Sequence, residues 1–455
     1  MQTRQSPSPA ETISDGRVTP SLRIIPRAEH GISRRQISAA ALKVLYRLAE
    51  AGHAAYLVGG AVRDLLLGGS PKDFDVATDA TPEQVQALFR NCRLIGRRFR
   101  LAHVLFGAEI IEVATFRAIH ADPDDDREVV DGRVVRDNVW GTQEEDALRR
   151  DFTVNALYYG ITDFAVRDYV GGFEDLIGRR LRLIGDPETR YREDPVRMLR
   201  AVRLAAKLGF VIDPPTEAPI ARMRGLLREV PPARLFDECL KLFLTGHAVE
   251  SFLGLERHGL IPVLFPETAQ ALASDREGKG RALILRALSN TDARVREDKP
   301  VTPSFLFAAL LWPAYRAAAE TRSAAGLDPQ RAHQEAAQEV LSAQTRIVAL
   351  PRRFSGPLVE IWGMQWRFER RQRRRVVALL QHPRFRAAFD FLALRREESA
   401  ALAELVEWWE AAQRAGDREL ADLLAAAAGS SEERKTRRRR RRRGRKREAG
   451  SAAEG

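Results

Sequence analysis

The 455-residue chain is predicted to form an α/β head followed by a mostly α-helical body and a disordered basic tail. Three observations predict this fold class. Short β-type runs alternate with helical pieces as far as about residue 159, as in α/β domains. The segments that follow are mostly helical, with proline or glycine between them. Residues 434–447 then carry twelve Lys and Arg and no acid, a charge density that cannot be buried.

Composition indicates a protein without membrane spans. Its hydrophobic content is 44%, and the sequence has no uncharged apolar run of the ~18 residues that a transmembrane helix needs. The first residues are polar and contain proline, so we expect a disordered lead-in and a cytoplasmic location. The two cysteines, Cys92 and Cys239, lie in helical or apolar segments, which excludes a disulfide framework.

The net charge of +12 comes entirely from the arginine-rich segment 434–447, because without it the basic and acidic residues balance at 62 each. Like charges at this density repel one another, so we expect an extended arm suited to a polyanion. RNA, DNA and an anionic membrane surface all fit. A solubilising tail without a specific partner is the alternative.

The head begins with a predicted amphipathic helix over Ile37–Ala51 and a strand over Ala54–Val58. Gly59 and Gly60 then open the helical segment AVRDLLL. A glycine turn between a strand and a helix lets a phosphate group approach the backbone. On its own such a pair is usually only a turn.

Two aspartates follow in the segment DFDVAT. In an extended chain, side chains alternate between faces, so Asp73 and Asp75 point to one side and Phe74 to the core. Two carboxylates at this spacing can bind a hard divalent cation, and Mg²⁺ is the natural candidate. A solvated strand end is the alternative for an isolated Asp-x-Asp pair.

A further acid lies in the predicted strand Glu109–Phe116. Glu112 stands among aliphatic residues, where a charge is costly unless it is paired or bound to metal. It is therefore either a third acid near Asp73 and Asp75 or the partner of a neighbouring arginine such as Arg117. The next segment, Asp122–Asp137, is acid-rich and poorly periodic, and we predict a mobile loop.

Two basic segments complete the candidate site. RRDFTVNAL places Arg149, Arg150 and Asp151 just before Asn155. These residues form either an ion pair or a site for triphosphate or ribose hydroxyls, in which Asp151 contributes to metal binding or sugar positioning.

In REDPVRMLRAVRLAAKLG, Asp194 is predicted to cap a helix that Pro195 begins and Gly209 ends. Arg197, Arg200, Arg203 and Lys207 share one side of this helix. This basic stripe is either a solvated face or a surface for nucleotide or RNA. Further helices are predicted at Ala233–Leu244, Val249–His258, Pro303–Ala319 and Arg374–Leu380.

The glycine-opened helix, the Asp-x-Asp strand, RRDFTVNAL and EDPVRMLRAVR occur in this order. Together they resemble the bacterial class of the DNA polymerase β-like nucleotidyltransferases, which contains the tRNA CCA-adding enzymes and the bacterial poly(A) polymerases. The resemblance implies a nucleotidyltransferase head that reads its base without a template. It assigns residues to triphosphate and metal (Gly59, Gly60, Arg63, Asp64, Asp73 and Asp75), to the sugar region (Arg149, Arg150, Asp151 and Asn155) and to the base (Glu193, Asp194 and Arg197).

Three features are similar to the poly(A) polymerase branch. They are LIGRRFRLAHV at Leu94–Val104, the two body segments PSFLFAALLWP and HPRFRAAFDFLALR, and the basic tail. The resemblance implies Mg²⁺ as cofactor, ATP as substrate, and extension of RNA 3′ ends, with RNA-decay proteins as further partners. It leaves open whether Glu112 or Asp151 is the third catalytic carboxylate.

CCA addition to tRNA is the alternative activity, and a non-catalytic RNA-binding factor is the alternative from another class. The expected organisation has five parts: a disordered segment over 1–35, the head over 36–175, a helical nucleotide- and RNA-binding neck over 176–265, an RNA-binding body over 266–428 and the disordered tail over 429–455.

Overall fold

The computed structural model describes residues 22–96, 100–119, 127–130, 133–137 and 139–427. The chain divides between Met223 and Arg224 into two compact units. The predicted tail over 429–455 lies outside the described residues. The other boundaries of the predicted five-part organisation stay predictions.

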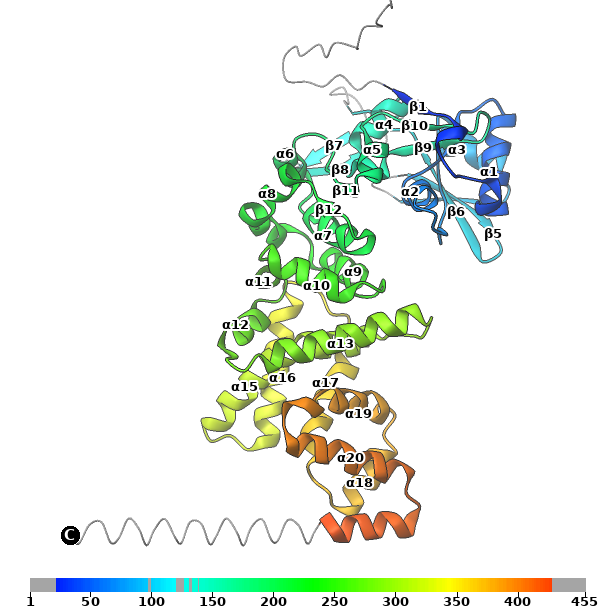
Figure 1. The fold of residues 1–455 in the computed structure, drawn as a ribbon. Coiled ribbons are helices and arrows are strands. Elements are labelled where there is room, and N and C mark those ends of the chain that lie inside the picture. The colour runs from blue at the N-terminus through cyan, green and yellow to red at the C-terminus, as the bar shows by residue number, and fades with distance from the viewer. Residues whose placement is uncertain (1–21, 97–99, 120–126, 131–132, 138, 428–455) are drawn as a thin grey trace, which may run out of the picture. The chain divides into compact units, whose positions relative to one another are not determined.

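The first unit is built on an eight-stranded mixed sheet, whose strand order is β1-β10-β9-β2-β3-β6-β5-β4. Figure 1 labels β1, β10, β9, β6 and β5 of this sheet. All neighbouring strands run antiparallel except β3 and β6, which are parallel. The strands are β1 (Arg23–Ile25), β2 (Ala55–Val58), β3 (Asp75–Thr78), β4 (Cys92–Ile95), β5 (Leu101–Phe106), β6 (Glu109–Thr115), β9 (Leu157–Gly160) and β10 (Val166–Asp168).

The two faces of this sheet are covered differently. Helix α1 (Ala39–Glu50) packs against β2, β3 and β6, and its Val44, Leu45 and Leu48 are fully buried. On the face that carries Asp75, Val58 and Tyr158 join a separate buried cluster. The other α-helices of this unit are α2 (Gly60–Leu66), α3 (Pro82–Leu88), α4 (Gln143–Arg149), α5 (Gly172–Ile177), α6 (Pro187–Glu193), α7 (Val196–Leu208) and α8 (Pro214–Met223).

Two predictions for the first unit are wrong in part. Within the segment expected to be disordered, Arg23–Ile25 forms β1 and pairs with β10, because Ile25 is fully buried there. Within the expected loop, β7 (Arg127–Val130) and β8 (Arg133–Asp137) pair as an antiparallel two-stranded sheet. Backbone pairing in such a ribbon does not require the regular hydrophobic alternation that the sequence lacks there. A second small sheet pairs β11 (Arg180–Leu181) with β12 (Val211–Ile212).

The second unit is helical, as predicted. The predicted helix Pro303–Ala319 is two helices, since α14 ends at Leu310 and α15 starts at Trp312. Pro313 lacks the N–H that would continue the first helix. The helices are α9 (Pro232–Phe243), α10 (Ala248–Arg257), α11 (Ile261–Leu264), α12 (Pro266–Ser274), α13 (Lys279–Arg296), α14 (Pro303–Leu310), α15 (Trp312–Ala324), α16 (Pro329–Thr345), α17 (Arg352–Phe368), α18 (Arg373–Leu380), α19 (Phe385–Leu394) and α20 (Ala400–Arg414).

Tryptophans form much of the core of this unit. Trp362 and Trp409 are fully buried, and their indole N–H groups donate to the carbonyl oxygens of Ala308 and Phe368, each over 3.0 Å. Core packing is therefore their role. None of the described helices has the length and apolarity that crossing a membrane requires.

Candidate active site

The glycine turn at the end of β2 is confirmed. Gly59 has φ +69° and ψ −134°, a backbone conformation that residues other than glycine rarely adopt. Its carbonyl oxygen accepts the first hydrogen bond of α2, from the Arg63 N–H over 3.2 Å. A Cβ at Gly59 would lie 3.6 Å from Arg150 Nη1, in ordinary contact. The backbone conformation, and not lack of space, requires glycine here.

Asp73 and Asp75 project from one side of the chain, with Phe74 buried between them. Strand pairing brings Glu112 to the same place, because Asp75 on β3 is the register partner of Glu112 on β6. Register partners point to the same face of a sheet. The sheet thus gathers three acids at the start of β3.

The electrostatics of this acidic cluster fit a cation. The pKa of Asp75 is raised to about 6. The largest cause is loss of hydration to the surrounding atoms, although part of the residue is exposed. Glu112 and then Asp73 raise the pKa further, whereas Arg150 opposes them. A bound cation would favour the charged carboxylates. In the described part of the chain no three ligand-type side chains converge as a ready-made metal site, but Mg²⁺ usually needs only one or two carboxylates beside substrate phosphates.

Glu112 has a partner that the sequence did not reveal. Its Oε2 lies 3.4 Å from His103 Nε2, and His103 is its register partner on β5. Arg117, the predicted partner, also contributes a favourable charge interaction with Glu112. The geometry places Glu112 beside Asp75 but also gives it partners of opposite charge. Its role as a third acid therefore stays a prediction.

Arg150 is held on the face of the sheet that carries Asp75. Its Nη2 donates to Asp146 Oδ2 over 2.9 Å, and its Nε donates to Tyr158 Oη over 2.9 Å. Tyr158 Oη in turn donates to the same Asp146 oxygen over 2.7 Å. Although burial is the largest effect and opposes the charge, Asp146 and Tyr158 together raise the Arg150 pKa. Arg150 therefore places a fixed positive charge near Gly59 and Asp75.

Asp151 makes contacts on both of its carboxylate oxygens. Oδ1 accepts from the Phe152 N–H over 2.8 Å and from Asn155 Nδ2 over 3.3 Å. Oδ2 accepts from Arg200 Nε over 2.7 Å and from Arg200 Nη2. Burial alone would raise the pKa of Asp151, but Arg200 and these hydrogen bonds lower it.

The same network reaches the glycine-opened helix. Arg63 is buried, and its guanidinium donates to Asn155 Oδ1 over 2.6 Å and to Asp64 Oδ1 over 2.8 Å. Lys207 Nζ lies 3.4 Å from the other Asp64 oxygen. Two parts of the predicted site, Arg63–Asp64 and Asp151–Asn155, are thus joined by direct hydrogen bonds. The predicted contact of Arg63 with triphosphate stays a prediction.

The residues predicted to read the base are joined to the sugar segment by Arg190, which the sequence analysis missed. Arg190 Nη2 donates to the carbonyl oxygens of Arg149 and Arg150 over 2.7 and 2.5 Å. Its Nη1 donates to Glu193 Oε2 over 2.7 Å. Arg197 Nη1 donates to the same glutamate oxygen over 2.8 Å. The three-residue spacing of Arg190 and Glu193 on α6 was the only sequence signal for this contact.

Asp194 lies between α6 and α7. Its Oδ1 accepts from the Val196 N–H over 3.2 Å, while Pro195 takes the N-cap position of α7. The predicted cap is therefore displaced by one residue. Gly209 ends the helix in a left-handed conformation, as predicted. Arg149, the remaining predicted residue, donates from Nη1 to the Ala118 carbonyl oxygen over 3.4 Å.

The basic stripe on α7 faces acids of the first unit. Arg197 pairs with Glu193, Arg200 with Asp151 and Lys207 with Asp64. The stripe is thus neither a purely solvated face nor a free cationic surface, because these three side chains attach α7 to the predicted site.

Comparison with known proteins places this site in a family. Residues 55–182, which include most of the site, match the family model described as the poly A polymerase head domain. The poly(A) polymerase I of Salmonella typhimurium is 51% identical over 412 residues, which cover 89% of each chain. The chain belongs to the poly(A) polymerase I family. Two further models of this family match residues 209–272, described as a probable RNA- and SrmB-binding site of polymerase A, and residues 325–446, described as its arginine-rich C-terminus.

In the sequence comparison, a CCA-adding enzyme matches less of this poly(A) polymerase family chain, although the fold of another CCA-adding enzyme is similar over most of it. The CCA-adding enzyme of Bacillus subtilis is 43% identical over 208 residues, which cover 46% of this chain and 50% of the relative. A crystal structure of the Bacillus stearothermophilus CCA-adding enzyme in complex with CTP aligns with a TM-score of 0.54 and 26% identity, and covers 85% of this chain and 82% of that one. The sequence resemblance to the nucleotidyltransferases is confirmed, including its poly(A) polymerase branch.

Proposed function

We propose that this protein is a template-independent polynucleotide adenylyltransferase, which extends RNA 3′ ends with AMP from ATP. The observation that carries the proposal is the 51% identity to a poly(A) polymerase I across 89% of both chains. By contrast, the match to a CCA-adding enzyme covers less than half of this chain. The family models that match residues 209–272 and 325–446 are both described for polymerase A, which also favours poly(A) synthesis.

In the proposed reaction, the RNA 3′ hydroxyl attacks the α-phosphorus of ATP. A new phosphodiester bond forms, the bond from the α-phosphorus to the bridging oxygen breaks, and pyrophosphate leaves with the electron pair. Asp73 and Asp75 are proposed to hold Mg²⁺, with Glu112 beside them as a third acid. When bound, Mg²⁺ stabilises negative charge on the reacting oxygens.

The remaining site residues position the nucleotide. The Gly59–Gly60 turn offers backbone close to the triphosphate, and the Arg150 guanidinium adds positive charge. Asp151 and Asn155 are proposed to orient the sugar. Arg63, whose guanidinium also donates to Asn155, is proposed to contact the β and γ phosphates. Glu193, Asp194 and Arg197 are proposed to select adenine by hydrogen bonds to its edge, which suits a site without a template strand.

The wider setting is also a proposal. We place the reaction in the cytoplasm and expect RNA-decay proteins as partners, so that added tails promote RNA decay. Support comes from the family model that matches residues 209–272, because its description names both RNA and SrmB as binding partners. The arginine-rich tail, in sequence suited to a polyanion, is proposed to hold RNA phosphates.

CCA addition to tRNA is the second candidate, and the likeness to a CCA-adding enzyme in complex with CTP favours it. The two functions differ in nucleotide use and product length. Purified protein with Mg²⁺ should be given a short 3′-hydroxyl RNA and, separately, a tRNA that lacks its CCA end, with each nucleoside triphosphate alone and then with all four.

Poly(A) synthesis predicts long ladders on both RNAs with ATP alone. CCA addition predicts that extension occurs only on the tRNA, needs CTP, and stops after three nucleotides. No incorporation at all would support a non-catalytic RNA-binding factor and contradict both enzymatic functions.

A further inference from the structure

The second unit carries a dense run of arginines, most of which have no carboxylate partner among the described residues. The segment RFERRQRRR, Arg367–Arg375, contains six arginines and one acid, Glu369. It joins the end of α17 to the start of α18. Five of these arginines are exposed, and Arg371 is partly buried. We call this segment the arginine strip.

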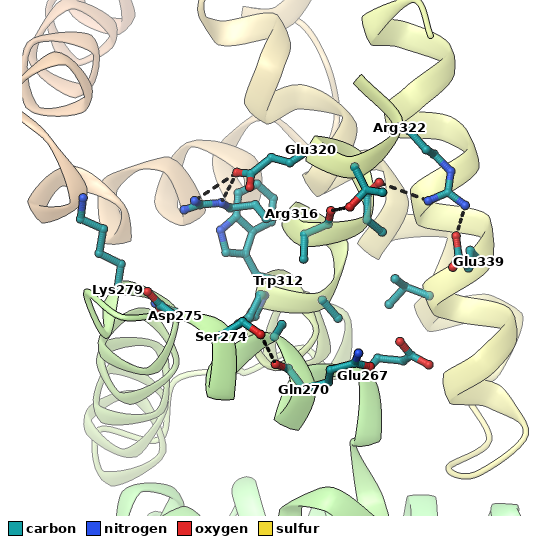
Figure 2. A pocket seen from close by; sticks show the side chains of 18 of the residues that line it. Glu267, Gln270, Ser274, Asp275, Lys279, Trp312, Arg316, Glu320, Arg322 and Glu339 are labelled. Carbon is teal, nitrogen blue, oxygen red and sulfur yellow. Dashed lines mark hydrogen bonds and ion pairs between the residues drawn. The ribbon is translucent and has the colours of Figure 1, made fainter. Parts of the chain in front are cut away.

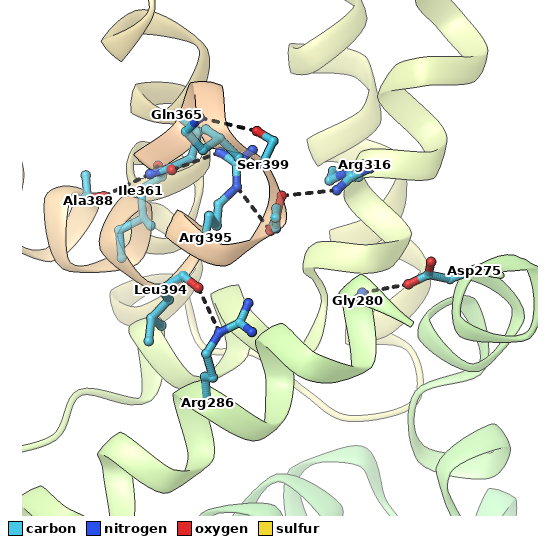
Figure 3. A network of polar contacts seen from close by, with 12 residues as sticks. Asp275, Gly280, Arg286, Arg316, Ile361, Gln365, Ala388, Leu394, Arg395 and Ser399 are labelled. Carbon is cyan, nitrogen blue, oxygen red and sulfur yellow. Dashed lines mark hydrogen bonds and ion pairs between the residues drawn. The ribbon is translucent and has the colours of Figure 1, made fainter. Parts of the chain in front are cut away.

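Several other arginines of this unit are paired with acids. Figure 2 shows Arg316 beside Glu320, with Nη2 and Oε1 3.2 Å apart, and Arg322 beside Glu339. Figure 3 shows the partly buried Arg395, which donates to Gln365 Oε1 over 3.2 Å. These cations have local partners that account for their positions.

The arginine strip differs in this respect. Among the described residues, no carboxylate forms an ion pair with the exposed arginines of the strip, which are Arg367, Arg370, Arg373, Arg374 and Arg375. Arg373, Arg374 and Arg375 also form the first turn of α18, where the helix dipole disfavours positive charge. Mutual repulsion and the dipole both oppose the positive charges of Arg373, Arg374 and Arg375, so these three side chains do not stabilise the fold electrostatically. A polyanion would supply the missing counter-charge.

Aromatic rings accompany these charges. Trp366, on the last turns of α17, is only partly buried, and the guanidinium carbon of Arg370 lies 4.4 Å from its ring centroid. The His333 ring packs against the same indole and is nearly parallel to it, with 6.1 Å between the two ring centroids. Arg371 lies over the Trp408 ring at 5.2 Å. Tryptophan and arginine planes are the surfaces on which unpaired bases stack.

A cavity lies beside this tryptophan. Trp366 and Arg370 line a cavity of about 720 Å³, together with Arg316, Arg395 and the acids Glu320, Glu369 and Glu398. Arg316 and Arg395 are paired with Glu398 within this lining. A base extruded from a single strand has room next to Trp366 while its phosphate contacts the strip.

We propose that the arginine strip and Trp366 bind the backbone and one base of single-stranded RNA, upstream of the end that is extended. The inference deepens the proposed function, because that function identifies the polyanion as RNA. A duplex would not suit the site, since its bases are already stacked on one another.

The test measures binding without catalysis. Affinity of the full chain for a 3′-deoxy oligo(A) of about 20 nucleotides is measured at several salt concentrations, without nucleoside triphosphate, so that the result does not depend on enzymatic activity. Each phosphate contact on a single strand contributes about −0.7 to the slope of log K against log salt. The triple variant Arg373→Ala, Arg374→Ala, Arg375→Ala should therefore reduce the magnitude of the slope by about 2, or about 100-fold in affinity at 0.1 M salt.

A matched control removes the same charge from paired positions. Arg281, Arg331 and Arg386 are exposed arginines of the same unit, paired with Glu256, Glu335 and Asp390. Their triple alanine variant should keep most of the wild-type slope. Both variants should stay folded, and the strip variant should unfold at or above the wild-type temperature, because it relieves repulsion.

Two outcomes would overturn the proposal: an unchanged salt slope in the strip variant, or an equal loss in the control, which would reduce the effect to net charge. A duplex that competes as well as the single strand would overturn the assignment to single-stranded RNA. Trp366→Ala should weaken binding about 5- to 100-fold, by the loss of one stacked base, and Trp366→Phe should restore part of it. If RNA binds as predicted but wild-type protein adds no AMP, the proposed function fails while the strip remains an RNA-binding surface.

Discussion

Arg200 on α7 donates two hydrogen bonds to the carboxylate of Asp151, across 49 residues of sequence. This contact joins the helix that carries Arg197 to the segment that carries Asn155. Burial is the largest single effect and raises the Asp151 pKa, but Arg200 and the hydrogen bonds from Phe152 and Asn155 together lower it. Arg200 is the main group that keeps the carboxylate charged.

The first prediction concerns this pair and pH. Since the folded pKa of Asp151 is lowered, the pair contributes stability above the unfolded pKa of about 3.9, and this contribution is lost as the pH falls toward the folded pKa. Arg200→Ala should reduce the free energy of unfolding at pH 7 by about 1–3 kcal/mol. Chemical denaturation should show the difference from wild type shrinking below about pH 4. A difference that persists unchanged at low pH would contradict the ionic origin of the effect.

The second prediction concerns Arg190, which touches both the sugar segment and Glu193. Arg190→Ala should free Glu193 and Arg197 to move, so that discrimination between ATP and CTP falls about tenfold, or about 1.4 kcal/mol. Steady-state kcat/KM values for the two nucleotides measure this ratio. A merely structural residue would lower both values alike.

Arg192→Ala is the matched control for this prediction. Arg192 lies on the same helix and is mostly exposed, and its Nη2 lies 3.8 Å from Glu188 Oε2. The control should keep both nucleotide specificity and stability. Equal loss of specificity in Arg190→Ala and Arg192→Ala would contradict the positioning role of Arg190.

The third prediction tests the backbone at Gly59. Gly59→Ala should destabilise the protein by about 1–3 kcal/mol, because alanine is strained at φ +69°. Gly31→Ala is the control, since Gly31 lacks a positive φ and a Cβ there meets open space. Denaturation midpoints of the two variants give the comparison. Equal stability of the two would mean that the turn relaxes without cost.

The fourth prediction concerns the acid beside Asp75. Glu112→Gln should reduce kcat about tenfold or more, as for residues that support a metal site. It should also lower the pKa of Asp75, because Glu112 is the main charge that raises it. Glu109→Gln, on the same strand but the opposite face, is the control. Unchanged kcat in Glu112→Gln would leave Asp73 and Asp75 as the only acids required.

Local patterns predicted much of the fold and of the site. The glycine turn at Gly59, the alternation of Asp73, Phe74 and Asp75, and the helix end at Gly209 depend on residues that are close in sequence, and the structure confirms them. Helix breaks within apolar segments were harder to predict from the sequence. The break at Leu311 was missed because the apolar pattern continues across it.

Contacts across long sequence separations could not be predicted. The α7 stripe looked like a surface for a ligand, yet Arg200 and Lys207 reach Asp151 and Asp64 over 49 and 143 residues. The pairing of Glu112 with Asp75 depends on the parallel register of β3 and β6. Such partners are determined by how the strands and helices pack, which charge spacing along one helix does not specify.

The most direct test of the central claim is the length of the product that wild-type protein and Asp75→Asn form from ATP alone on a short 3′-hydroxyl RNA with Mg²⁺. We predict a long ladder for wild type and a rate at least about 10³-fold lower for Asp75→Asn, with RNA affinity unchanged. Absence of extension by wild type with ATP alone, or a full ladder from Asp75→Asn, would contradict adenylyl transfer at this site.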